Sequence, residues 1–116
     1  MIARGQISLA SLDPDFGSEQ GKVRPVVIVS SNAANDSANR RGAAVVTVVP
    51  VTSNVRSVYP FQVLLTPEES GLPVPSKAQA EQVRSIGTAR LVRHIATLPM
   101  PLVRKVDDAL RLHVSL

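Results

Sequence analysis

Two runs of β-branched residues decide the fold of this chain: Pro25-Val26-Val27-Ile28-Val29-Ser30 and Ala43-Ala44-Val45-Val46-Thr47-Val48-Val49-Pro50-Val51. Short apolar runs bounded by turn residues are typical of strands that are buried on both faces. We therefore expect strands over 25–30 and 43–51. Proline has no N–H to donate to a neighbouring strand, so Pro50 predicts an edge, a bulge or the end of its strand.

Weaker patterns on both sides of these runs predict more β-structure. The segment 77–86 contains alanine and glutamine, which favour a helix, but its neighbours favour a strand, and we interpret it as one strand. Segments rich in polar residues or proline are predicted to be loops. The further strands are expected at 6–12, 61–66 and 92–98, and the loops at 31–42, with room for a helical turn, and at 66–76.

The C-terminus is the one region with clear helical periodicity. Val103, Val106, Leu110 and Val114 form a stripe with helical spacing. Several short strands followed by one helix predict a mainly β fold with a C-terminal α-helix, arranged as a small barrel or a twisted sheet closed by the helix. With 116 residues, the chain is expected to form a single domain over 1–116.

The composition excludes several classes of chemistry. The chain has no cysteine and only two histidines, His94 and His113. Disulfides, thiolate nucleophiles and multi-histidine metal sites are therefore excluded. We find neither an apolar run of the ~20 residues that a membrane-spanning helix needs nor a signal-peptide core. We expect a soluble cytoplasmic protein without a membrane partner.

The charge balance favours a polyanionic partner. Thirteen Lys and Arg residues face nine Asp and Glu residues, giving a net charge of +4, and ten of the thirteen are arginines. The planar guanidinium suits phosphate, because it can donate two parallel hydrogen bonds. Three aromatic residues are too few for a base-stacking surface. Contacts to a nucleic acid should therefore depend on the phosphate backbone and on hydrogen bonds.

Three polar groups lie where an expected strand meets a loop. Arg24 precedes Pro25, which holds it extended at the start of a buried strand. Thr52 directly follows the second apolar run and could contact a phosphate or cap a turn. The third group lies in Gln79-Ala80-Glu81-Gln82-Val83-Arg84. Each group could equally be a solvated surface feature.

The order of these motifs resembles the PemK/MazF family of toxin endoribonucleases, and the mycobacterial-type members most of all. The resemblance runs from Arg4-Gly5-Gln6-Ile7 to Leu110-Arg111-Leu112-His113. Between these ends lie Leu12-Asp13-Pro14, Gly17-Ser18-Glu19-Gln20, Arg24-Pro25-Val26-Val27-Ile28-Val29-Ser30, Val48-Val49-Pro50-Val51-Thr52-Ser53, Tyr59-Pro60-Phe61 and Gln79-Ala80-Glu81-Gln82-Val83-Arg84-Ser85-Ile86.

The resemblance implies an SH3-like β-barrel ending in a helix, and a symmetric homodimer. Single-stranded RNA would bind in a groove across the dimer, and the tail of a cognate antitoxin would occupy the same surface. The family's reaction implies no metal and no cofactor. The ribose 2′-OH attacks the adjacent phosphorus and leaves a 2′,3′-cyclic phosphate and a 5′-OH, so DNA cannot be cleaved.

The resemblance also assigns roles to individual residues. Arg24 would stabilise the anionic phosphorane, and Thr52 would hydrogen-bond a phosphate oxygen. Glu19 and Glu81 remain alternatives for the base that takes the 2′-OH proton. The residues expected to contact RNA are Ser18, Lys22, Ser53, Arg56, Lys77, Gln79 and Arg84, with Arg40 and Arg41 as further candidates for its backbone.

This sequence departs from the family at three positions. Ser18 stands where some members have a histidine, Gln79 where some have an arginine, and Ser8 where many have a tryptophan. The family's fold also occurs in a toxin class that inhibits DNA gyrase through protein contacts, so a non-catalytic gyrase inhibitor is the alternative function. A toxin-like RNA binder without catalytic activity is a third possibility.

Overall fold

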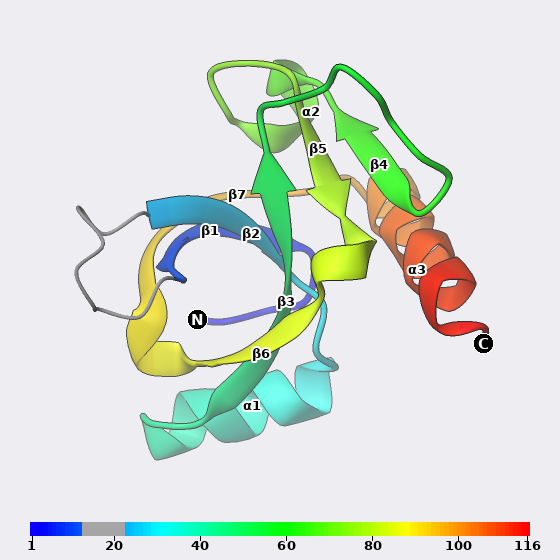
Figure 1. Ribbon diagram of the computed structural model, residues 1–116. Coiled ribbons are helices and arrows are strands. Elements are labelled where there is room, and N and C mark those ends of the chain that lie inside the picture. The colour runs from blue at the N-terminus through cyan, green and yellow to red at the C-terminus, as the bar shows by residue number, and fades with distance from the viewer. Residues whose placement is uncertain (13–22) are drawn as a thin grey trace.

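Seven antiparallel strands form one curved sheet in the part of the chain that the computed structural model describes, residues 1–12 and 23–116 (Figure 1). The strands are β1 (Gln6–Ser11), β2 (Val23–Ile28), β3 (Val45–Thr52), β4 (Gln62–Leu65), β5 (Ser76–Gln79), β6 (Arg84–Gly87) and β7 (Leu91–Thr97). The helices are α1 (Asn32–Arg41), α2 (Pro67–Ser70) and α3 (Met100–Val114), and the 3-10 turns are η1 (Ala80–Gln82) and η2 (Thr88–Arg90).

The strand order is β4-β5-β3-β2-β1-β7, and β6 pairs separately with β3. Within the described residues, β4 and β7 lie at the two ends of this order and the sheet does not close on itself. The mainly β fold with a C-terminal helix is confirmed. The curved sheet is compatible with the predicted SH3-like barrel.

Strand β3 is the centre of the sheet, because it pairs with three other strands. On one side it pairs with β2, where Pro50 lies opposite Val26. On the other side its first half pairs with β6 up to Val48, and its end pairs with β5 from Val51. The turn η1 separates β5 from β6, so Pro50 falls where this second ladder is interrupted. The interruption of the ladder is a place where a missing N–H costs little.

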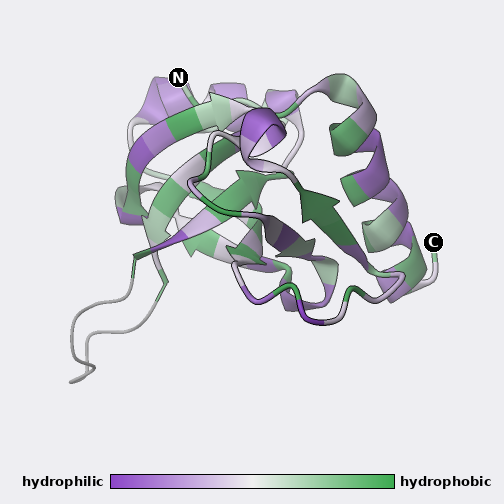
Figure 2. Ribbon diagram, turned by 90° about the horizontal axis from the view of Figure 1, so that it is seen from above, coloured by the Kyte–Doolittle hydropathy of each residue, from purple (hydrophilic) through white to green (hydrophobic). Residues whose placement is uncertain are grey.

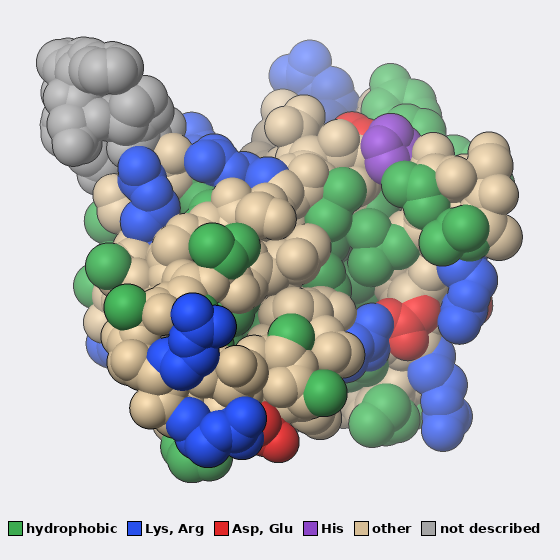
Figure 3. All heavy atoms as spheres, turned by 90° about the horizontal axis from the view of Figure 1, so that it is seen from below, with side chains coloured by type: hydrophobic (Ala, Val, Ile, Leu, Met, Phe, Trp, Pro, Cys, Tyr) green, Lys and Arg blue, Asp and Glu red, His purple; other side chains and the backbone are tan. Residues whose placement is uncertain are grey.

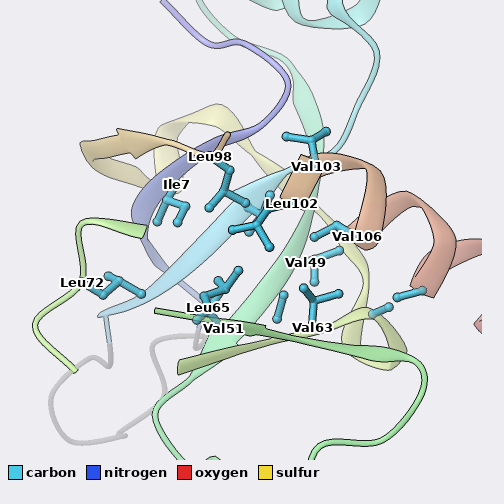
Figure 4. Close-up of a cluster of buried hydrophobic side chains, with 14 residues drawn as sticks. Ile7, Val49, Val51, Val63, Leu65, Leu72, Leu98, Leu102, Val103 and Val106 are labelled. Carbon is cyan, nitrogen blue, oxygen red and sulfur yellow. The ribbon is translucent and has the colours of Figure 1, made fainter. Parts of the chain in front are cut away.

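Both faces of the central strands are buried, as the apolar runs predict. Val27, Val49 and Val51 point into one hydrophobic cluster, which α3 covers. In Figure 4, side chains of the sheet and of α3 converge in this cluster. The alternate residues of β2 and β3, with Ala38 of α1, form a second cluster on the opposite face. The period of two along each strand therefore divides the valines between two cores.

Helix α3 confirms the helical stripe at the C-terminus, with a shift at its end. It buries Leu102, Val103, Val106 and Ala109 against the sheet, while Val114 is exposed. Hydrophobic and hydrophilic residues alternate along α3 in Figure 2, as in an amphipathic helix. The stripe ends before Val114, since residues 111–116 at this end of the chain are exposed.

The predicted loop 66–76 contains the four-residue helix α2, which Thr66 caps. Two further predictions of secondary structure are wrong. Residues 31–42 contain α1, which Ser31 caps by accepting a hydrogen bond from the N–H of Ala34. Gly42 ends this helix with a left-handed φ of 76°. Segment 77–86 is divided into parts of β5 and β6 by η1. Both features are set by capping and turn geometry, which apolar periodicity does not reveal.

Within the described residues, none of the helices is both long and apolar enough to span a membrane.

Candidate active site

Arg24 and Thr52 lie side by side at the end of two neighbouring strands. Arg24 is the second residue of β2, and Thr52 is the last residue of β3. The β2–β3 ladder ends at the pair Val26–Pro50, and Arg24 and Thr52 each lie two residues beyond this pair on their own strand. Both residues line the same two hollows at this end of the ladder. The structure thus brings together the arginine and the threonine singled out by the sequence.

Both side chains line two adjoining hollows, which we call the main hollow and the side hollow. The main hollow has a volume of about 370 Å³ and the side hollow one of about 220 Å³. The main hollow is lined by Leu12, Arg24, Pro50, Val51, Thr52, Gln79, Gln82 and Arg84. The side hollow is lined by Val23, Arg24, Pro25, Val51, Thr52, Ser53, Leu72, Pro73, Val74 and Ser76.

The charge of the main hollow is positive. Arg24 and Arg84 line it, and none of the described residues that line it is acidic. Arg84 donates one hydrogen bond from Nη1 to the carbonyl of Leu12 at 3.3 Å, which leaves further donors of its guanidinium for a ligand. Lys and Arg side chains are also widely spread over the face that carries α1, where Asp and Glu show at few places (Figure 3). Two guanidinium groups at one hollow suit a phosphodiester.

The hydroxyl of Thr52 is oriented by the backbone that follows it. The N–H of Asn54 donates to Thr52 Oγ1 at 3.2 Å, and the N–H of Arg56 donates to Asn54 Oδ1 at 3.2 Å. Because Oγ1 already accepts this hydrogen bond, its own proton is available as a donor. Thr52 is half-buried, so the hydroxyl has a fixed position at the wall of the hollow. It can donate to a phosphate oxygen.

Gln79 also lines the main hollow, and Ser53 lines the side hollow. Arg56 is exposed and lines neither of them. Arg40 and Arg41 lie in the last turn of α1, just before β3 begins. Thr52 is at the opposite end of this eight-residue strand, about 20 Å away at the usual rise per residue. These two arginines are therefore outside the hollow.

Two other predicted residues are held by polar contacts outside the hollows. Lys77 is only 7% exposed, and its ammonium donates to the carbonyl of Ser57. Glu81 Oε2 accepts a hydrogen bond from Gln62 Nε2 at 2.7 Å. Glu81 Oε1 is buried and has no hydrogen-bond partner among the described residues. Neither Lys77 nor Glu81 lines the main or the side hollow.

Gln82 is a site residue that the sequence prediction did not select. It is exposed and lines the main hollow together with Gln79 and Arg84. In a continuous strand, Gln79 and Gln82 would face opposite sides. The 3-10 turn η1 rotates the chain between them, and both amides reach the same hollow. A turn signal within 77–86 would have been needed to find this residue.

The predicted residues Ser18, Glu19 and Lys22 lie outside the described residues. Leu12 and Val23, which flank that part of the chain, line the main hollow and the side hollow respectively. The described ranges contain no group of three or more His, Asp or Glu side chains that could hold a metal ion.

Comparisons with known proteins agree over the whole chain. A family model described as PemK-like, MazF-like toxin of type II toxin-antitoxin system matches residues 3–114. Endoribonuclease MazF9 of Mycobacterium tuberculosis (strain ATCC 25618 / H37Rv) is 52% identical over 116 residues, covering 100% of this chain and 98% of that protein. Endoribonuclease EndoA of Bacillus subtilis (strain 168) is 32% identical over 117 residues, covering 100% of this chain and 97% of that protein.

Among solved structures, an endoribonuclease in complex with its cognate antitoxin from a mycobacterial species has a TM-score of 0.77 to this chain. It is 25% identical, and the match covers 100% of this chain and 97% of that chain. The curved sheet, the C-terminal helix and the basic hollow thus define a small mainly β protein with the fold of these toxins. The chain belongs to the PemK-like, MazF-like toxin family of type II toxin-antitoxin systems.

Proposed function

We propose that this protein is the toxin of a type II toxin-antitoxin system and acts as an endoribonuclease on single-stranded RNA. The observation that carries the proposal is that Arg24 and Thr52 line the same basic hollow. The relatives MazF9 and EndoA are both endoribonucleases, which supports RNA cleavage over gyrase inhibition.

The hollow offers the groups that an attack by the ribose 2′-OH requires. The phosphorane that forms carries more negative charge than the phosphodiester, so fixed donors stabilise it more than they stabilise the substrate. Arg24 can donate two hydrogen bonds to its oxygens, and it stays protonated throughout. Thr52 supplies an oriented O–H to a phosphate oxygen and so fixes the attack geometry. The products would be a 2′,3′-cyclic phosphate and a 5′-OH.

The base that takes the 2′-OH proton must come within about 3 Å of that hydroxyl. Of the two carboxylates that the sequence offers, Glu81 is bound to Gln62 outside the hollow. We therefore favour Glu19 for this role. Its segment is flanked by Leu12 and Val23, both of which line the hollows.

Further proposals concern the partners. A solved relative is a complex of an endoribonuclease with its cognate antitoxin, which supports an antitoxin as the regulator here. We propose that the antitoxin's tail occupies the RNA surface and that two copies form a symmetric homodimer. We also place the protein in the cytoplasm, where single-stranded RNA is available as its substrate.

The test is incubation of the purified protein with mixed cellular RNA in excess EDTA, followed by mapping of the new ends. We expect discrete fragments with 5′-OH ends and 2′,3′-cyclic phosphates, since the proposed reaction needs no metal. Intact RNA together with RNA retention on a filter would instead indicate a binding protein without catalytic activity. Intact RNA together with inhibited supercoiling by gyrase would support the alternative toxin class.

A further inference from the structure

The segment 53–61 connects β3 to β4 and begins directly after Thr52. Its first residues contact the site, because the N–H of Asn54 holds Thr52 Oγ1. Its last residues are held by two buried polar side chains from outside the segment, Lys77 and Gln62. The position of the catalytic hydroxyl and the anchoring of this segment are therefore linked.

Lys77 holds the middle of the segment. Lys77 pairs with Thr52 across the β3–β5 ladder, so the two side chains project from the same face. The ammonium of Lys77 donates to the carbonyl of Ser57 and lies 5.8 Å from the centroid of the Tyr59 ring. The Tyr59 ring stacks on Phe61 at a centroid distance of 5.6 Å. One buried cation thus contacts two places in the segment.

Gln62 fixes the end of the segment. Its side-chain Oε1 accepts from the backbone N–H of Tyr59 at 3.1 Å, and its backbone N–H donates to the carbonyl of Tyr59 at 2.8 Å. Its Nε2 donates to Glu81 Oε2 at 2.7 Å. Glu81 belongs to η1, whose neighbours Gln79 and Gln82 line the main hollow. Glu81 and Gln62 therefore connect the segment to the turn that forms the opposite wall of the hollow.

We propose that Lys77 and Glu81 are positioning residues that hold the 53–61 segment and η1 in register, so that Thr52, Gln79 and Gln82 face the same phosphodiester. The proposal rests on the proposed function of the hollow. Both residues act through others, because neither lines the hollow. A displacement of about 1 Å at Thr52 suffices to lower the rate, since the attack needs aligned atoms.

Glu81 is tested by comparing Glu81→Gln with Glu81→Ala. The glutamine keeps a carbonyl oxygen that can accept from Gln62, so we expect a rate within about threefold of the native enzyme. The alanine loses the contact, and we expect a loss of about tenfold, the effect of one hydrogen bond. Removal of a general base would instead cost roughly 10²- to 10⁴-fold in both variants. A loss of that size in Glu81→Gln would overturn the positioning role.

Lys77 is tested by the salt dependence of RNA binding, with Arg84→Met as the matched variant. The ligand is an oligonucleotide that contains a mapped cleavage site and a 2′-deoxy sugar at the attacking position, so it binds without being cleaved. Each phosphate contact to a single strand contributes about 0.7 to the slope of log K against log [salt]. We expect Lys77→Met to lower kcat and to leave the slope unchanged. We expect Arg84→Met to reduce the slope. A reduced slope in Lys77→Met would show a direct contact to RNA and contradict the proposal.

The segment itself can be observed without activity. Tyr59 is the only tyrosine, and the chain has no tryptophan, so the protein's tyrosine fluorescence reports on this segment. We expect stronger acrylamide quenching in Lys77→Met and Glu81→Ala than in Glu81→Gln or the native protein. Unchanged quenching in Lys77→Met and Glu81→Ala would refute the anchoring. Failure of the proposed function would appear differently, as intact RNA after incubation with the native protein.

Discussion

The open rim of the hollow, with Arg24 and Thr52, differs from the buried layer, by which we mean the side chains of Lys77 and Gln62 that hold the 53–61 segment. Arg24 on the rim is exposed, whereas Lys77, which pairs with Thr52 across the ladder, is only 7% exposed. The rim can touch a ligand, while the buried layer can act only through the segments that it holds. A position next to a site residue therefore does not decide whether a side chain contacts the ligand or supports the residues that do.

The largest effect should come from the rim. We expect Arg24→Ala to lower kcat by 10²- to 10³-fold or more, because a preorganised donor to the phosphorane is lost. The thermal midpoint should stay close to the native value, since the side chain is exposed. Single-turnover cleavage of a mapped RNA site and thermal unfolding measure the two effects. Native activity in this variant would remove the site assignment.

The next largest effect should come from Thr52: we expect Thr52→Ala to lower kcat by about 10²-fold. Thr52→Ser is the matched control, because serine keeps the hydroxyl that donates to phosphate and accepts from Asn54. We expect the serine variant to recover most of the rate. Equal losses in both variants would indicate that the methyl group, and not the hydroxyl, is what the site needs.

Substitutions in the buried layer should lower the stability of the fold more than those at the rim, and should lower activity less. Gln62→Ala removes the side-chain hydrogen bonds to Tyr59 and Glu81, whereas the backbone bond from the Gln62 N–H to Tyr59 stays; Gln62 is 8% exposed. Buried groups that lose their partner cost about 1–3 kcal/mol of unfolding free energy. We expect a loss in this range by urea denaturation, with a smaller effect on cleavage than Arg24→Ala. If Gln62→Ala were as stable as the native protein and as inactive as Arg24→Ala, the different roles of the rim and the buried layer would be contradicted.

Arg56 should give the smallest change. It is exposed and lines neither hollow, and the one hydrogen bond described for it comes from its backbone. We expect Arg56→Ala to weaken RNA binding by less than about threefold, mainly at low salt, where exposed charges are poorly screened. A larger loss that persists at high salt would place Arg56 in the binding surface beside Thr52.

Much of the central fold is predictable from the sequence, because apolar runs report burial directly. The valines that follow Pro25 and those around Pro50 predict the two central strands, and Pro50 lies where the ladder of β3 with β5 and β6 is interrupted. Helix α1 was not predictable in this way. It buries only Asn35 and Ala38, so its sequence has no apolar stripe, and a serine cap and a terminal glycine define its ends.

The candidate site was predictable in part for the same reason. Arg24 and Thr52 flank the two apolar runs, whose strands pair with each other, and both residues line the same hollows. The direction of Glu81 depends on η1, which replaces a strand by a tight turn. Spacing along the chain cannot give that rotation, so the carboxylate that looked available to RNA is bound to Gln62 instead.

The pairing of β3 with β2, β5 and β6 has a consequence for how the molecule unfolds. Its valines reach both hydrophobic clusters, so separating this strand from its neighbours opens the two cores at once. The amide protons of β3 should therefore exchange with solvent only when the entire molecule unfolds.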